Sequence, residues 1–139
     1  MTASALSNAK QALQQLQAFL VEPIVSDRDK AGVIQAFEFT FEAAWKLLQK
    51  LAAAQGLEAP SPKKALAAAF RLGVIDDELL WLDMLKDRNL TTHTYQAALA
   101  EAIFAQVRDR YAAALTKAIS AAEEDEGGYY SKAHKLIGP

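Results

Sequence analysis

The stretch from residue 30 to residue 55 limits the possible folds more than any other part of the sequence, because its apolar residues repeat with the period of an α-helix. Spacings of three and four place these residues on one face of a helix, and such a face is normally buried. Asp27 and Asp29 provide start signals before Lys30, and Gly56 provides the end signal, so we expect one long helix here. The stripe consists of Ile34, Phe37, Phe41, Trp45, Leu48 and Leu51.

Start and stop signals place further helices on both sides of this one. An apolar stripe from about Ala3 to Val21 predicts a first helix, which ends before Pro23. Ser61 is a suitable N-cap, and Pro62 fits the first helical position of a third helix that ends near Gly73.

The second half of the chain predicts two more helices. We expect Asp76 to cap a fourth helix, with Ile75 and Leu80 packing over the cap as a hydrophobic staple. Apolar residues about one turn apart predict a last long helix from about Gln96 to Ala121. Four to five helices with short connections predict an all-α fold, an antiparallel up-down bundle.

Two features of the stretch 30–55 lie outside its buried stripe. Glu38, Glu42 and Lys46 follow one another at a spacing of four, which we interpret as a solvated face with one ion pair between neighbouring turns. Phe39 points away from the apolar stripe. Because an extra apolar face usually meets a partner, we expect a homodimer.

The length of 139 residues fits one domain, which we place at residues 1–121. Residues 122–139 form an acidic and then glycine-rich segment, which we expect to be a mobile C-terminal tail. The alternative is that the apolar residues of this tail dock onto a neighbouring subunit. His134 lies in the tail, and we assign it no chemistry.

Charged residues are distributed so that the body of the protein is neutral. The acidic run 123–126 accounts for much of the net charge of -2, and residues 1–122 carry equal numbers of acidic and basic side chains. Strong non-specific binding of nucleic acid depends on many Lys and Arg contacts to phosphate. A neutral body therefore argues against such binding, and RNA chemistry would need a local site or a groove made by more than one subunit.

Several other classes are excluded by what the sequence lacks. It has no cysteine, which rules out disulfides, thiolate zinc sites and a cysteine nucleophile. No segment resembles a signal peptide or reaches the length of about 20 apolar residues that spans a bilayer. We therefore expect a cytoplasmic protein that makes no membrane contact.

The segment "RNLTTHTY" at residues 88–95 concentrates the residues with the greatest chemical potential. On an unbroken helix Arg88 and His93 would be separated by about 140° around the axis. Asn89 can end the fourth helix there, and Thr91, Thr92 or Thr94 can cap the next one, so the chain can turn. With that turn, the guanidinium and the imidazole can converge on one pocket.

Arginine and histidine together are sufficient for metal-independent RNA cleavage. The guanidinium can grip a phosphate with two hydrogen bonds, while the imidazole exchanges protons near neutral pH. Since one histidine cannot easily serve as both acid and base, a site assembled from two subunits is the more capable arrangement. The alternative interpretation is a simple helix-end loop in which Arg88 pairs with a carboxylate such as that of Asp87 or Asp83.

Metal and cofactor sites are not expected. The two histidines lie far apart in the sequence, and no paired metal-ligand spacing, glycine-rich phosphate loop or nucleophile elbow is present. We therefore predict no metal ligands and no cofactor.

The segment "RNLTTHTY" also matches the R-x4-H-x-Y motif, and its surroundings extend the match. "FEFTFEAAWKLLQ" at residues 37–49 and "AAFRLGVIDDELLWLDMLKDRNLTTHTY" at residues 68–95 resemble the HEPN superfamily, in the branch of nucleotidyltransferase substrate-binding proteins that is related to HepT toxins. The resemblance covers roughly residues 28–118. It implies a dimerising helical bundle encoded near a separate minimal nucleotidyltransferase that acts as antitoxin.

The resemblance also implies roles for individual residues. Arg88 and His93 would be the catalytic residues of an endoribonuclease acting on RNA such as tRNA. Tyr95 would be the residue that the partner adenylylates with AMP from ATP, which silences the toxin. Asn89 and Asp87 flank the arginine and would support the site.

A second function is compatible with the same resemblance. The protein would be a non-catalytic subunit that binds the substrate or the nucleotide for a separate nucleotidyltransferase. The neutral body favours this alternative, because an RNA enzyme usually has more basic character.

Overall fold

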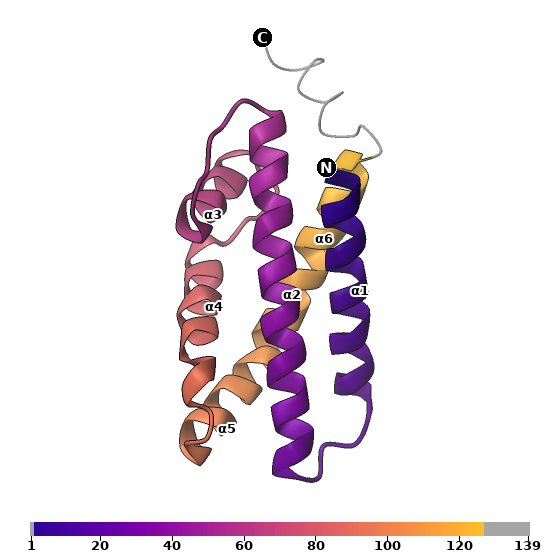
Figure 1. The fold of residues 1–139 in the computed structure, drawn as a ribbon, viewed down its shortest axis with the longest axis vertical. Helices are drawn as coiled ribbons and strands as arrows, with labels where there is room; N and C mark the ends of the chain where they lie inside the picture. Colours follow the sequence, from indigo (N-terminus) through magenta and orange to yellow (C-terminus); the bar gives the residue numbers. More distant parts are fainter. Residues whose placement is uncertain (1, 127–139) are drawn as a thin grey trace.

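The computed structural model describes residues 2–126, and these residues form helices and short connections only. The predicted all-α class is therefore confirmed (Figure 1). The elements in chain order are α1 (Thr2–Val21), α2 (Asp27–Ala54), α3 (Pro62–Arg71), α4 (Glu78–Leu90), a 3-10 turn (Thr91–His93), α5 (Ala97–Gln106), a π-helical turn (Val107–Tyr111) and α6 (Ala112–Glu126).

The helices pack as an antiparallel up-down bundle around α2. Figure 1 shows α1 on one side of α2, α3 and α4 one above the other on the opposite side, and α5 with α6 crossing behind as one long rod. Helices α3 and α4 together therefore occupy the place that a single third helix would take in a four-helix bundle. None of the helices among residues 2–126 is long and apolar enough to cross a membrane.

Helix α2 begins earlier than its apolar stripe suggested, because Ser26 caps it. The Ser26 hydroxyl accepts a hydrogen bond from the Asp29 backbone N–H at 3.2 Å, and the Asp29 carboxylate accepts one from the Ser26 N–H at 2.9 Å. This reciprocal pair is a capping box. Hydrogen bonds from the Val25 and Ser26 backbone hold the pKa of Asp29 below its usual value.

The predicted ends of α2 and α3 are confirmed by their glycines. Gly56 and Gly73 adopt φ values of 80° and 78°, which side chains with a Cβ rarely tolerate. The Leu57 N–H reaches back to the Ala52 carbonyl at 2.8 Å, and the equivalent bond after α3 runs from Val74 to Ala69 at 3.0 Å. Ser61 and Pro62 occupy the predicted cap and first position of α3.

The predicted cap of α4 is wrong by one residue. Asp77 is the N-cap, and its carboxylate accepts a hydrogen bond from the Leu80 N–H at 3.0 Å. Asp76 instead pairs with Lys117 of α6. Since the cap lies at Asp77, Ile75 and Leu80 are not at staple positions, and Ile75 is buried in the core.

The predicted last helix is interrupted. A π-helical turn at Val107–Tyr111 separates α5 from α6, and α6 continues past Ala121 to Glu126. Ala122 is buried in the core, so the described part of the C-terminal segment begins as packed helix. The remainder of the predicted tail, with His134, lies outside the described residues.

The core forms where the apolar stripe of α2 meets the other helices. Phe37 and Phe41 are fully buried, and their rings lie 5.5 Å from Tyr111 and 6.1 Å from Trp81 respectively. Phe39 is 54% exposed, which confirms that it points away from this stripe. Packing around α2 thus fixes which side chains of this helix remain available on the surface.

Candidate functional site

The segment 88–95 spans the end of α4, the 3-10 turn and the connection to α5. Helix α4 continues through Asn89 to Leu90, so Asn89 does not end it as predicted. The Thr91 hydroxyl donates to the Arg88 carbonyl at 2.7 Å, and the Thr94 hydroxyl donates to the Thr91 carbonyl at 2.9 Å. The threonines therefore close the end of α4 rather than capping α5.

The Arg88 side chain bridges α4 and α2. Its guanidinium pairs with the Glu42 carboxylate and donates a hydrogen bond to the Asn89 side-chain oxygen at 3.1 Å. The guanidinium carbon also lies 5.9 Å from the centre of the Phe41 ring. Arg88 thus pairs with a carboxylate, as the alternative interpretation expected, but the partner is Glu42 and neither Asp87 nor Asp83. Because a guanidinium has five N–H groups, this anchoring leaves donors for a further anion.

Glu42 is the site residue that sequence analysis missed. The predicted ion pair between Glu42 and Lys46 is present at 3.4 Å, but Glu42 also faces Arg88, so its stripe is more than a solvated face. The only sequence signal was the spacing of four, which says nothing about a partner on another helix.

The charge of Glu42 is stabilised by this environment. Burial by itself tends to raise the pKa of the Glu42 carboxyl, but hydrogen bonding to Arg88 and the positive charges of Arg88 and Lys46 outweigh it and lower the pKa. Among residues 2–126, Trp45 Nε1 is buried without a hydrogen-bond partner, so Arg88 is the main group that lowers the pKa of Glu42. Glu42 therefore remains an anion that holds the guanidinium in place.

Asp87, which the resemblance predicts to support the site around Arg88, is bound to Tyr111. Its carboxylate accepts a hydrogen bond from the Tyr111 hydroxyl at 2.6 Å and so joins α4 to the π-helical turn. Burial raises the pKa of Tyr111 far above its ordinary value, and the hydrogen bond and charge of Asp87 raise it further. Asp83 pairs in a similar way with Arg110, at 3.4 Å.

The hydrogen bond between Tyr111 and Asp87 predicts that the free energy of unfolding depends on pH in the alkaline range. Tyr111→Phe removes the hydrogen bond to Asp87, so we expect a loss of about 1–2 kcal/mol in the free energy of unfolding at neutral pH. Because the pKa is raised by folding, the contribution of Tyr111 is fully present below the unfolded value of 10.0 and is lost as the pH rises above it.

Urea unfolding of both proteins between pH 7 and 11 measures this difference. The gap between wild type and Tyr111→Phe is expected to narrow above about pH 10. Tyr95→Phe, which removes an exposed hydroxyl, serves as the control and should match wild type at neutral pH. A gap that stays constant at high pH would show that Tyr111 ionises equally in both states.

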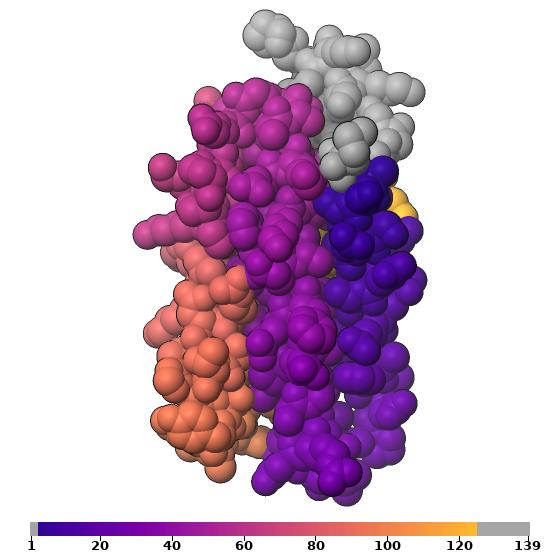
Figure 2. Space-filling view, in the orientation of Figure 1, coloured from indigo at the N-terminus to yellow at the C-terminus, as the bar shows by residue number. Residues whose placement is uncertain are grey.

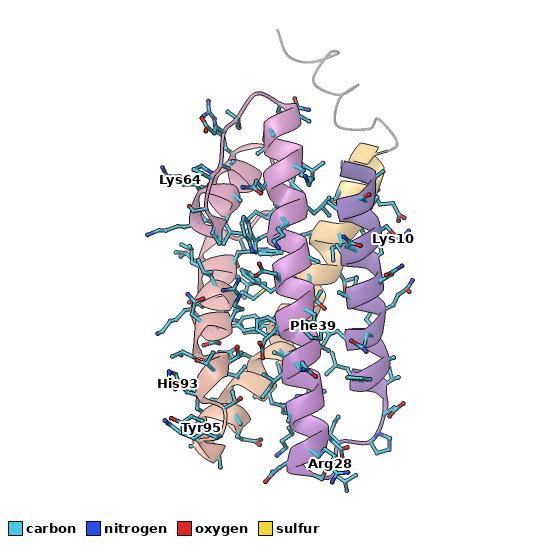
Figure 3. All side chains as sticks on the ribbon, viewed as in Figure 1. Lys10, Arg28, Phe39, Lys64, His93 and Tyr95 are labelled. Carbon is cyan, nitrogen blue, oxygen red and sulfur yellow. The ribbon has the colours of Figure 1, made fainter. Side chains whose placement is uncertain are left out.

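His93 and Tyr95 are both on the surface below the end of α4 (Figure 3). Tyr95 is 79% exposed, and the two rings meet edge to face with centres 6.1 Å apart. Among residues 2–126, no hydrogen bond joins the His93 side chain to Arg88. Within the described residues, Arg88 is therefore hydrogen-bonded to Asn89, and His93 packs against Tyr95.

Two cavities lie close to these residues. One has a volume of about 360 Å³ and is lined by Thr94 and Tyr95 together with the first turns of α2 and α5. The other has a volume of about 330 Å³, lies between α1 and α2, and includes Glu42 in its wall. Within residues 2–126, no three His, Cys, Asp or Glu side chains are grouped so that they could hold a metal ion.

Comparison with known proteins gives a consistent result. Residues 4–124 match the family model described as nucleotidyltransferase substrate binding protein like. A curated protein of Haemophilus influenzae named "Probable ribonuclease HepT" is 35% identical over 91 residues. That alignment covers 62% of this chain and 62% of the relative, so the match spans less than two thirds of the relative's length.

Solved structures agree with the fold. A crystal structure of a protein from Thermus thermophilus is 38% identical, with a TM-score of 0.76, and the match covers 82% of this chain and 98% of that one. A second structure, from Haemophilus influenzae, is 28% identical with a TM-score of 0.66, covering 88% and 96%. Its title describes the fold of a substrate binding domain of a nucleotidyltransferase.

Proposed function

Because the chain belongs to the nucleotidyltransferase substrate binding protein like family, we propose that it is the HepT-like toxin of a toxin–antitoxin pair, a metal-independent endoribonuclease. In this proposal Arg88 and His93 are the catalytic residues, and RNA is the substrate. The relative named as a probable ribonuclease, which is 35% identical over 91 residues, supports the activity.

The anchoring of Arg88 is the observation that carries the proposal. Glu42 and Asn89 hold the guanidinium at the end of α4, five residues before an exposed imidazole. The Arg88 side chain is 29% exposed, so it can still reach an anion from solvent. A fixed, partly buried cation suits the charge that builds on a phosphate in the transition state.

The reaction follows from these groups. The ribose 2′-oxygen attacks the adjacent phosphorus, the bond to the 5′-oxygen breaks, and a 2′,3′-cyclic phosphate and a 5′-hydroxyl form. His93 accepts the proton from the 2′-hydroxyl or donates one to the leaving oxygen. Since one imidazole cannot do both at once, we propose a homodimer in which a second copy supplies the other His93.

Incubation of the purified protein with mixed tRNA in excess EDTA tests this function. We expect cleavage that persists in EDTA and leaves 2′,3′-cyclic phosphate ends. Absence of cleavage by the unmodified protein, or cleavage that requires a divalent metal, would contradict the proposal.

Glu42 has a positioning role in this proposal, and Glu42→Gln tests it. The variant keeps the shape of the side chain but removes the charge that holds Arg88, so we expect kcat for RNA cleavage to fall about tenfold or more with little change in KM. Glu38→Gln, one turn earlier on α2, is the matched control and should cleave as wild type does. Equal activity in both variants would show that Arg88 needs no fixed partner.

Regulation by a partner forms the second part of the proposal. A separate minimal nucleotidyltransferase, encoded nearby, would transfer AMP from ATP to the Tyr95 hydroxyl and release pyrophosphate. Tyr95 is highly exposed and lies beside His93, so the added group would place bulk and negative charge at the catalytic residue. Repulsion of the RNA phosphates would then silence the ribonuclease.

Intact-mass measurement after co-expression with that nucleotidyltransferase tests the modification. We expect wild type and Tyr111→Phe to gain the mass of AMP, because the Tyr111 hydroxyl is buried against Asp87 and cannot be the target. Tyr95→Phe should gain nothing. Undiminished addition to Tyr95→Phe would place the modification elsewhere.

A non-catalytic role is the second candidate. The match to a structure described as a substrate binding domain of a nucleotidyltransferase favours a subunit that binds substrate or nucleotide for a separate enzyme. Such a subunit should tolerate alanine at Arg88 or His93 with a change in affinity only. The cleavage assay therefore separates the two functions.

A further inference from the structure

The cavity between α1 and α2 has features that the catalytic residues do not use. Its volume is about 330 Å³, and its wall includes Phe39, Lys46 and Lys50 from α2 with Ser4 and Asn8 from α1. The seam between these helices lies on the face seen in Figure 2, and Figure 3 places Phe39 on this part of α2. Because Phe39, Lys46 and Lys50 are exposed, the cavity opens to the surface, and we call it the groove.

An exposed aromatic ring is the first notable feature of this groove. Phe39 is 54% exposed although α2 buries its neighbours Phe37 and Phe41 completely. An aromatic face in an open groove can stack against a nucleobase, since every base offers a π-face and needs no specific edge contact. Phe39 thus provides a platform for one unpaired base.

Positive charge is the second feature. Lys46 and Lys50 are exposed on successive turns of α2, and both line the groove. Among residues 2–126, the one carboxylate that lines the groove is Glu42, which pairs with Arg88 and also with Lys46, at 3.4 Å. Positive charge beside an aromatic ring favours the binding of a nucleic acid, because its phosphates are anionic and its bases can stack. It suits an apolar protein surface poorly, because that surface would desolvate both lysines.

Glu42 also connects this groove to Arg88. Its carboxylate contributes to the groove wall and at the same time pairs with Arg88 on the other side of α2. Glu42 therefore links the groove wall to the guanidinium that the proposed function assigns to a phosphate.

We propose that this groove binds single-stranded RNA, with one base stacked on Phe39 and neighbouring phosphates on Lys46 and Lys50. The proposal rests on the proposed function for the identity of the ligand and adds a subsite outside the catalytic residues. It also assigns Phe39 to RNA, where the sequence suggested a second copy of the chain.

Binding rather than cleavage tests the subsite. Fluorescence anisotropy would follow a fluorescein-labelled single-stranded oligouridylate of about eight nucleotides, within the usual site size of such grooves. The protein would be His93→Ala, so that the probe stays intact. We expect Phe39→Ala to weaken binding by between about fivefold and a hundredfold, which corresponds to the loss of one stacked base.

The contribution of Lys46 and Lys50 is measured by the salt dependence of binding. The slope of log affinity against log salt concentration is expected to become shallower by about 1.4 when Lys46 and Lys50 are both changed to alanine, because each phosphate contact to a single strand contributes about 0.7. Matched controls lie on α3, where Phe70 is 46% exposed and Lys63 and Lys64 are exposed. Phe70→Ala and the double variant Lys63→Ala/Lys64→Ala should bind as the parent does.

Two results would overturn the subsite. The first is equal weakening, or none, in the groove variants and their controls. The second is conversion of a wild-type dimer to a monomer by Phe39→Ala in light scattering, which would assign this face to a second copy.

The cleavage and binding assays together distinguish an error in the proposed groove from an error in the proposed ribonuclease activity. Cleavage of tRNA in EDTA with no effect of the groove variants on binding would reject the subsite alone. Loss of binding in these variants without any cleavage by wild type would support the groove and reject the ribonuclease.

Discussion

RNA cleavage is expected to fall by at least two orders of magnitude when Arg88 or His93 is replaced by alanine. A positioned acid or base contributes about 10²- to 10⁴-fold, and a fixed cation at the developing charge contributes a similar factor. Both variants should retain the helical circular dichroism of wild type, because His93 is exposed and Arg88 is partly exposed. The rate of tRNA cleavage in EDTA is the measurement.

Each catalytic variant has a matched control. Arg110→Ala removes an arginine that, like Arg88, pairs with a carboxylate of another helix, and His134→Ala removes the other histidine of the chain. Both controls are expected to keep wild-type activity. A ribonuclease activity that survives in His93→Ala would mean that the imidazole is not the proton carrier, and the substrate-binding function would then be preferred.

The free energy of unfolding is expected to fall by about 3–5 kcal/mol in Phe37→Ala. Phe37 is fully buried, with ring centres 6.3 Å from Phe41 and 5.5 Å from Tyr111, so truncation removes apolar burial and leaves a cavity at the centre of the bundle. Urea unfolding followed by circular dichroism measures the change.

Phe39→Ala is the control for this core prediction. It makes the same truncation two residues further along α2, but its side chain is half exposed, so we expect a loss below about 1 kcal/mol. Comparable losses in the two variants would mean that the face around Phe39 is buried in the assembled protein, which would also count against its use by RNA.

The helical content could be predicted because its signals are local. The stripe from Ile34 to Leu51 follows the helical period, and glycines at 56 and 73 end two helices through a backbone conformation that other residues rarely adopt. The cap of α4 was less certain, because Asp76 and Asp77 are adjacent and both suit the position. In the structure Asp77 caps α4, and Asp76 pairs instead with Lys117 on α6.

The last helix exposed another limit of local patterns. Its apolar residues recur regularly enough to predict one continuous helix, whereas the structure contains a π-helical turn at Val107–Tyr111. Tyr111 packs its ring against Phe37 and donates its hydroxyl to Asp87. Both partners lie on other helices, so the spacing of apolar residues within 97–121 could not predict these contacts.

Local sequence patterns were sufficient to predict which segments are helical and which face of α2 is buried, and they singled out Arg88, His93 and Tyr95 as candidates for chemistry. The pairing of Arg88 with Glu42, and the hydrogen bond from Tyr111 to Asp87, could not be predicted from those patterns. The physical reason is distance along the chain. Periodicity and caps depend on residues within one or two turns, whereas an ion pair between residues 42 and 88 exists only after core packing has brought the two helix faces together.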